Sequence, residues 1–223
     1  MKDHSVKSNT EIAISKIRDL IFAGKLNAGS NHLETELADL LGMSRTPVRE
    51  AVLTLAAQGL LEVRPRKGVR ISPISASDMA EIYDVLTELE SLAAFNAAQQ
   101  SYSSTDLAQL STAIDKMDMA LATDDRQAWA DADEAFHTEL VRLGQNSRVQ
   151  MIVAMMSDQT RRARSVTLFM RPKPTKSNED HRGVLDAISK GQPETARQLH
   201  SAHRRSAKEI LIDLLDTHQL GSL

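Results

Sequence analysis

The sequence predicts a mainly α-helical protein: an N-terminal winged helix-turn-helix, with three helices and a two-stranded wing, followed by an all-α antiparallel helical bundle. Short elements separated by turn residues fill residues 1–75, whereas residues 76–223 are rich in helix formers with apolar residues at helical spacing. The charge divides at the same point, since the first part carries 11 Lys and Arg against 8 Asp and Glu, and the second carries 16 against 22. We therefore expect two domains with this boundary.

Three short helices are expected in the first part. The first begins at Thr10 and ends near Gly24, the second spans about residues 33–41, and the third spans about residues 45–58 after an N-cap at Ser44. The segments LLEVRP and GVRIS then alternate apolar and polar residues around the basic segment RPRKG, which predicts a two-stranded hairpin. Two helices, a short turn, a third helix and a basic hairpin form the layout of a winged helix-turn-helix.

Six longer helices are expected in the second part, because their apolar residues recur every three or four positions. They span about residues 78–100, 104–122, 125–144, 147–170, 176–190 and 193–218. The residues that fit their starts are Ser77, Ser104 and Pro193, and the glycines that fit helix ends are Gly144 and Gly191. Such a series packs as an all-α bundle.

Composition excludes several classes of protein. The chain has no cysteine, which excludes disulfide frameworks, thiolate zinc sites and cysteine nucleophiles. No apolar run approaches the roughly 18 residues that a membrane span needs. The first residues, MKDHSVKSNTE, lack the apolar core of a signal peptide. We therefore expect a cytoplasmic protein without a membrane partner.

A basic cluster lies on the third helix and the wing. Hydroxyl and arginine side chains at a helix N-terminus favour phosphate, because the free N–H groups and the helix dipole favour an anion there. Arg45 and Arg49 are four residues apart and share one face, where arginine forks suit guanine edges or phosphate oxygens. The residues expected to contact DNA are Ser44, Arg45, Thr46, Arg49, Arg66, Lys67 and Gly68. The alternative is a solvated surface on which Arg49 pairs with Glu50 or Glu62.

Four polar residues in the second part face a common interior. Asp133 and His137 share a helix face at i and i+4, His181 lies in line with apolar residues, and His203 lies at the centre of an apolar stripe. His200 lies to one side of that stripe. A divalent cation held by three imidazoles and one carboxylate would satisfy the four groups together, and zinc, nickel and manganese all accept such ligands. The alternative is a set of core imidazoles, each hydrogen-bonded to a backbone carbonyl.

The remaining histidines are expected to be solvated. They are His4, His32 and His218.

The segment SRTPVREA, preceded by LETELADLLGM and followed by GLLEVRPRKG, resembles the signature of GntR-type bacterial transcription regulators. The resemblance covers about residues 12–75. It implies that the arginines of the third helix contact bases or phosphates, that the hydroxyls at its start bind phosphate, and that the wing tip enters the minor groove of DNA.

The segments DEAFHTEL, EDHRGVLDAI and ARQLHSAHRR resemble the ligand-bearing parts of the FCD effector domain in the FadR branch of the same family. The metal-binding positions of that domain correspond here to Asp133, His137, His181 and His203. The resemblance covers about residues 78–210, and six helices rather than seven favour its VanR-like version.

One position departs from the family pattern. Such domains often carry an arginine that binds an effector carboxylate in their first helix, and YDVLTELE has Leu86 in its place. A carboxylate is then expected to be held by the RRAR segment, with Arg162 as the effector-binding candidate beside Arg161 and Arg164. The alternatives are a solvated basic face and a pocket for a less acidic molecule.

These observations predict a bacterial transcriptional regulator, taken to be a repressor, whose operator affinity is switched by a small organic acid in a metal-containing cavity. A homodimer on palindromic half-sites of double-stranded DNA is expected, because one recognition helix reads few base pairs. The alternatives are a metal-dependent hydrolase on the Asp/His site and a structural protein with a solvated basic patch. The sequence lacks P-loop, G-x-S-x-G and HExxH motifs, and the helix turns Glu134 away from His137, so we expect no enzyme.

Overall fold

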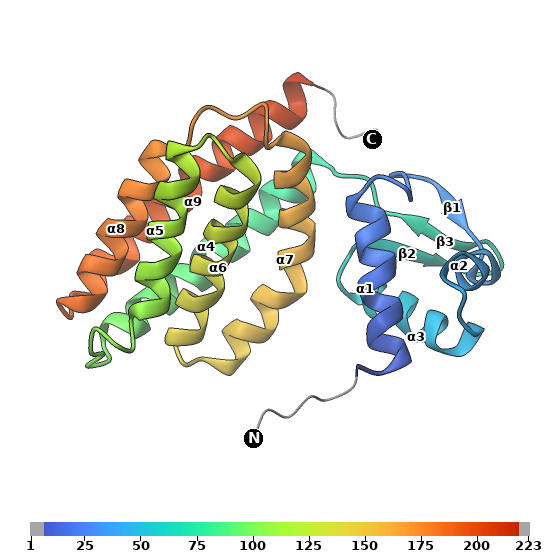
Figure 1. Cartoon of the computed structure of the whole chain (residues 1–223), viewed down its shortest axis with the longest axis horizontal. Coiled ribbons are helices and arrows are strands. Elements are labelled where there is room, and N and C mark those ends of the chain that lie inside the picture. Colours follow the sequence, from blue (N-terminus) through green and yellow to red (C-terminus); the bar gives the residue numbers. More distant parts are fainter. Residues whose placement is uncertain (1–6, 219–223) are drawn as a thin grey trace.

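A computed structural model describes residues 7–218 and shows a small winged part beside a helical bundle (Figure 1). The winged part contains α1 (Asn9–Phe22), β1 (Asn31–His32), α2 (Glu34–Leu41), α3 (Arg45–Ala57), β2 (Leu61–Arg64) and β3 (Gly68–Ile71). The bundle contains α4 (Ala76–Ala98), α5 (Ala108–Ala122), α6 (Arg126–Leu143), α7 (Ser147–Thr167), α8 (Thr175–Ser189) and α9 (Pro193–Thr217). The predicted fold class is confirmed, and the expectation for His4 lies outside the described residues.

The wing has a third strand that the sequence did not predict. Its sheet has the order β1-β3-β2 with antiparallel neighbours. Asn31 pairs with Arg70 and His32 pairs with Val69. The expectation of two strands was wrong because β1 has only two residues, too few to show the alternation that marks a strand.

Several helix starts differ from the predicted ones. The N-cap of α1 is Ser8, whose hydroxyl accepts from the backbone N–H of Glu11 in a capping box, and Thr10 instead donates to Glu50 at 2.6 Å. Ser75 rather than Ser77 caps α4. Helix α5 starts at Ala108 rather than near residue 104, because a turn held by Ser103 and Asp106 precedes it. Pro193 and Gly144 lie at the predicted positions.

Separate apolar cores support the two parts. The winged part encloses a cluster around Ile17, Val52 and Ile71, which comes entirely from residues 13–71. The bundle has two clusters, one centred on Phe136 and Leu140 and one on the face of α4 that packs against α9. Burial of these apolar faces is the main stabilising term of the fold. Within residues 7–218, no helix combines the length and the apolar character that crossing a bilayer requires.

The wing depends on glycine at position 68, which begins β3 with a φ of +79°. A Cβ atom at this position would collide with the backbone carbonyl of His32, the residue that brings β1 against β3. We expect Gly68→Ala to lower the free energy of unfolding by roughly 1–3 kcal/mol more than Gly42→Ala, measured by urea denaturation.

Gly42 is the matched control, because its φ is +64° and a Cβ would meet no atom within 4 Å. Gly42→Ala should therefore cost only left-handed backbone strain, about 1 kcal/mol. Equal losses in the two variants would contradict the close approach of β1.

Candidate functional site

Most of the predicted DNA-facing residues are exposed to solvent. Ser44 is the N-cap of α3 and makes no capping hydrogen bond with its side chain. The exposed residues of this set are Ser44, Arg45, Thr46, Arg49, Arg66 and Lys67, and Gly68 is half-buried. The alternative pairing of Arg49 is not observed, because Glu50 accepts from Thr10 and Glu62 pairs with Arg64 at 3.0 Å. The arginine forks of α3 therefore remain available to a polyanion.

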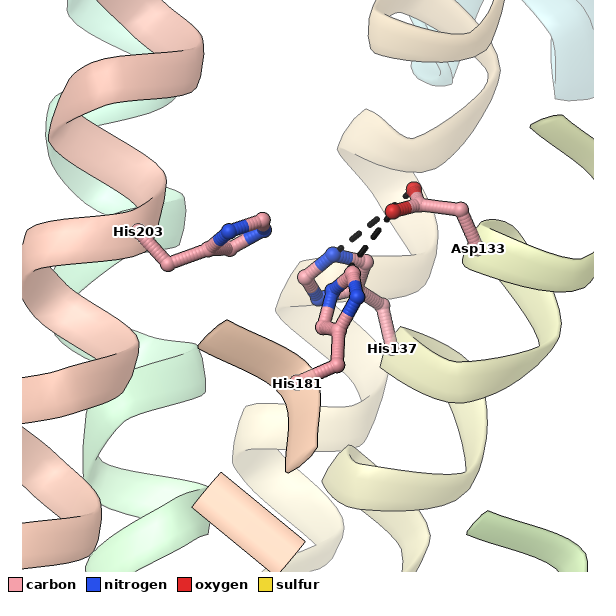
Figure 2. Close-up of side chains that lie close together, drawn as sticks. All are labelled: Asp133, His137, His181 and His203. Carbon is pink, nitrogen blue, oxygen red and sulfur yellow. Dashed lines mark ion pairs between the residues drawn. The ribbon is translucent and has the colours of Figure 1, made fainter. Parts of the chain in front are cut away.

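The structure brings the four predicted metal ligands together. Helix α6 supplies Asp133 and His137, α8 supplies His181, and α9 supplies His203. One ligand atom of each lies within 4.8 Å of the others, and all four side chains are buried. Figure 2 shows their polar ends pointing into one space between the three helices. Oδ1 of Asp133 lies 3.5 Å from Nε2 of His181, and Oδ2 of Asp133 lies 3.8 Å from Nε2 of His137.

The donor set fits a divalent cation. Both ring nitrogens of His181 are buried and have no hydrogen-bond partner among the described residues. Such orphaned polar atoms are costly, and a bound cation satisfies them. Three imidazole nitrogens and one carboxylate oxygen form a ligand set that zinc, nickel and manganese accept.

Glu90 and His200, which are not among the predicted ligands, lie beside the four predicted ligands. Glu90 of α4 places Oε2 at 3.0 Å from Nδ1 of His137 and at 3.4 Å from Nε2 of His200. Ser91 Oγ lies 3.2 Å from Nδ1 of His200. The His200 side chain is fully buried. Nδ1 of His137 thus faces this carboxylate and, at 3.4 Å, Nε2 of His200, which leaves Nε2 of His137 free to bind a metal.

Glu90 is not among the predicted ligands, although the sequence carries a signal for it. A carboxylate at this position interrupts a stripe of apolar residues on α4, and an acidic residue inside such a stripe needs a buried partner. Only the packing of α4 against α6 and α9 identifies the partners, which are His137, His200 and Arg204.

Charges inside the cluster are set by burial and by two arginines. Burial alone would raise the pKa of Asp133, but Arg164 and then the neighbouring imidazoles lower it far below its ordinary value. In the same way, Arg204 and His137 outweigh burial and lower the pKa of Glu90. Both carboxylates are therefore ionised at neutral pH.

Three buried imidazoles, those of His181, His200 and His203, are neutral at the same pH. Burial lowers the pKa of His181 well below its ordinary value, lowers that of His203, and lowers that of His200 to about 4. A neutral imidazole offers the lone pair that a metal requires, whereas a protonated one does not.

Among the three arginines of the RRAR segment, the structure places Arg164 beside the cluster, where it pairs with Asp133. Arg162, the predicted effector ligand, points away and donates from Nη1 to the backbone carbonyl of Ser72 at 2.5 Å. Arg161 pairs with Glu134 at 3.2 Å. Successive residues of a helix point about 100° apart, so one helix cannot direct all three side chains toward one cavity.

Two cavities meet at the cluster. One encloses about 270 Å³ and is lined by residues of α4, α6, α7 and α9 together with Phe22 of α1. The other encloses about 150 Å³ and is lined by Asp133, His203 and the segment that joins α7 to α8. The residues that line both cavities are His137, Arg164, Leu168 and Arg204. Leu86, at the position of the family's arginine, is buried in the wall of the larger cavity.

A winged helix-turn-helix with a free basic face, joined to a bundle around a polar cluster, defines a DNA-binding protein with a separate helical domain. Residues 9–71 match the family described as bacterial regulatory proteins, gntR family, and residues 81–206 match the FCD domain. The chain therefore belongs to the GntR family of transcriptional regulators, in the branch that carries an FCD domain. Members of this family bind DNA operators. The family and the known relatives are transcriptional regulators and not enzymes, which supports the predicted regulator over the alternative of a hydrolase.

Known relatives agree with this assignment. The chain is 30% identical over 203 residues to an uncharacterized HTH-type transcriptional regulator in an unstable DNA locus of Streptomyces ambofaciens, covering 90% of this chain and 84% of that protein. It is 30% identical over 204 residues to a probable D-xylose utilization operon transcriptional repressor of Paenarthrobacter nicotinovorans, covering 85% of this chain and 84% of that protein. The solved structure of E. coli McbR/YncC has the same fold, with a TM-score of 0.76, 22% identity and coverage of 94% and 99%.

Loss of the Glu90 carboxylate should weaken metal binding without removing a ligand. We expect Glu90→Gln to lower the affinity for zinc, nickel or manganese by about 10–100-fold, because the amide orients and polarises His137 less strongly. Competition with a chromophoric chelator measures the affinity. Glu139→Gln is the matched control, since Glu139 is also buried but pairs with Arg142 at 2.7 Å. Equal affinities in the two variants would contradict the role of Glu90.

The neutral imidazoles make the metal-free protein sensitive to acid. His200 has a pKa of about 4 in the folded state and 6.5 ordinarily, so the unfolded chain binds more protons between these values. We expect the free energy of unfolding of chelator-treated protein to fall as the pH drops from 6.5 toward 4, by up to about 3 kcal/mol for His200 alone. Urea denaturation at several pH values tests this, and His200→Asn should reduce the slope. An unchanged midpoint from pH 7 to pH 5 would contradict it.

Proposed function

We propose that this regulator is a repressor whose operator affinity is switched by a small organic acid, bound beside a divalent metal in the bundle cavity. The observation that carries the proposal is the buried set of Asp133, His137, His181 and His203, with the unpartnered nitrogens of His181 at its centre. A zinc, nickel or manganese ion held there would supply a coordination position for an effector oxygen. Residues 1–75 would read the operator and residues 76–223 would sense the acid.

Helix α7 joins the cluster to the winged part. Arg18 of α1 donates from Nε to Asp158 at 2.7 Å, and the guanidinium of Arg161 lies 5.3 Å from the centre of the Phe22 ring. Arg162 holds the carbonyl of Ser72, which follows β3. Figure 1 shows α7 on the side of the bundle that faces α1. A shift of α7 therefore moves the contacts that position the winged part.

Arg164 connects these contacts to the sensor, because it belongs to α7 and pairs with Asp133. An acid that enters the cavity competes for this guanidinium and changes the preferred position of α7. An effector can shift an equilibrium between two arrangements only by its difference in affinity for them, and the coupling is reciprocal. The cavity would therefore act as an allosteric site, and α7 would couple it to the winged part.

The operator contacts follow from the open basic surface. Arg45 and Arg49 would reach base edges or phosphates from α3, and Ser44 and Thr46 would hold phosphate at its N-terminus. Arg66, Lys67 and Gly68 would place the wing on the neighbouring backbone or minor groove. One recognition helix reads few base pairs, so we propose a homodimer on palindromic half-sites. The naming of the Paenarthrobacter nicotinovorans relative as a probable repressor supports that direction of control.

Two variants should separate operator binding from sensing. Fluorescence anisotropy on a duplex selected by the parent protein from random sequence measures affinity, with and without a panel of hydroxy- and keto-acids. We expect Arg49→Ala to lose about 5–150-fold in specific affinity, equivalent to about 1–3 kcal/mol, and to retain metal binding.

His203→Ala should bind the same duplex within about tenfold of the parent and lose the response to the acids, because it removes a metal ligand without touching the winged part. A His203→Ala protein that still responds like the parent would overturn the sensing role of the cluster. An Arg49→Ala protein with parental specificity would overturn the recognition surface.

A further inference from the structure

The smaller cavity contains polar groups that nothing in the described residues satisfies. The hydroxyl of Tyr83, Nη2 of Arg171 and Nε of Arg204 are buried with no hydrogen-bond partner among the described residues, and all three residues line this cavity. They come from α4, the segment after α7, and α9. Three orphaned polar groups from separate elements around one space indicate a site prepared for a ligand rather than one packing defect.

The charges of this wall favour an anion. Arg164 pairs with Asp133, and Arg204 places Nη2 at 3.4 Å from Glu90. Arg171 has no carboxylate partner among the described residues, since its Nε donates to the hydroxyl of Thr167 at 3.1 Å. A buried guanidinium without a counter-charge is costly.

The other carboxylate that lines this cavity is already engaged. Asp180 pairs with Lys176 and lies 3.6 Å from His203. It therefore offers little compensation to the guanidinium of Arg171. A divalent cation at the Asp133 cluster would add further positive charge to the same space.

Packing holds the cationic groups in place. The guanidinium of Arg204 lies 4.7 Å from the centre of the Tyr83 ring, and both side chains are almost fully buried. Arg204 also lines the larger cavity, so it borders both spaces beside the metal cluster. The rigid arrangement lowers the entropy lost when an anion binds.

We propose that Tyr83, Arg171 and Arg204 form a subsite for a second acidic group, so that the effector is a dianion with one acidic group at the metal cluster and another here. The proposal rests on the function proposed above and specifies its ligand. It also accounts for Leu86, because cationic groups from α9 and from the segment after α7 replace the arginine that the family often carries on its first bundle helix.

Matched acids test the subsite on the metal-loaded, full-length protein. L-malate and 2-hydroxybutyrate share the hydroxy-carboxylate end and differ in the second carboxylate, and succinate and butyrate form a second pair. Melting temperature is measured against concentration for each acid and for inorganic phosphate. We expect the dianion of a pair to bind at least tenfold more tightly to the parent, and Arg171→Met to lose this preference.

Arg205→Met is the matched control, because Arg205 neighbours Arg204 on α9 but is exposed to solvent. It should keep the parental preference for dianions. Tyr83→Phe provides a second readout: removing an unpartnered buried hydroxyl should leave the melting temperature in anion-free buffer equal to or above that of the parent, and should weaken the response to dianions. A hydroxyl with a structural hydrogen bond would instead lower the melting temperature.

The outcomes distinguish this proposal from the function on which it rests. If monoanions and dianions act equally on the parent and still change operator affinity, the subsite is wrong and the proposed function stands. If neither a dicarboxylate nor phosphate stabilises the parent more than Arg171→Met, the subsite is also wrong. A response to phosphate but to neither dicarboxylate supports the subsite and assigns the second acidic group as a phosphoryl group.

Discussion

The ionised carboxylate of Asp133 is the interaction on which the arrangement of the bundle interior depends. It lies in a buried position, where an unpaired charge is costly, so the surrounding helices must supply partners. Arg164 of α7 provides the counter-charge, while His181 of α8 and His137 of α6 turn ring nitrogens toward it. One carboxylate thereby links three helices, and a metal ion would bring in His203 of α9. The polar cluster is therefore part of the packing of the bundle as well as a candidate ligand site.

A second carboxylate, Glu90, makes the cluster two-sided. Its carboxylate lies within ion-pair distance of His137, His200 and Arg204. Apolar residues of similar volume would stabilise such an interior at least as well as paired charges. Stability alone therefore does not account for two carboxylates, three neutral imidazoles and two arginines in one buried space. The buried polar atoms of Tyr83 and Arg171 that lack partners among the described residues add to this cost.

Helix α7 gives the two parts of the molecule a common element. Its Asp158, Arg161 and Arg162 contact the winged part, and its Arg164 contacts the cluster. Helical geometry explains this division, because side chains 100° apart on one helix face different neighbours. The winged part also has its own apolar core, so it can change position relative to the bundle without unfolding. These features make a rigid-body response to a ligand physically reasonable.

The sequence by itself determined the order of the helices, the basic recognition surface and the four candidate metal ligands. Periodicity within one helix decides which side chains share a face, and this information is local, as for Asp133 and His137. Only the tertiary structure decided which faces meet. It placed Glu90 and His200 beside the predicted ligands, and it placed Arg164 rather than Arg162 next to Asp133. It also paired the two residues of β1 with a strand nearly 40 residues away. These features depend on how helices and strands pack against one another, and a rotation of one residue along a helix redirects a side chain by about 100°.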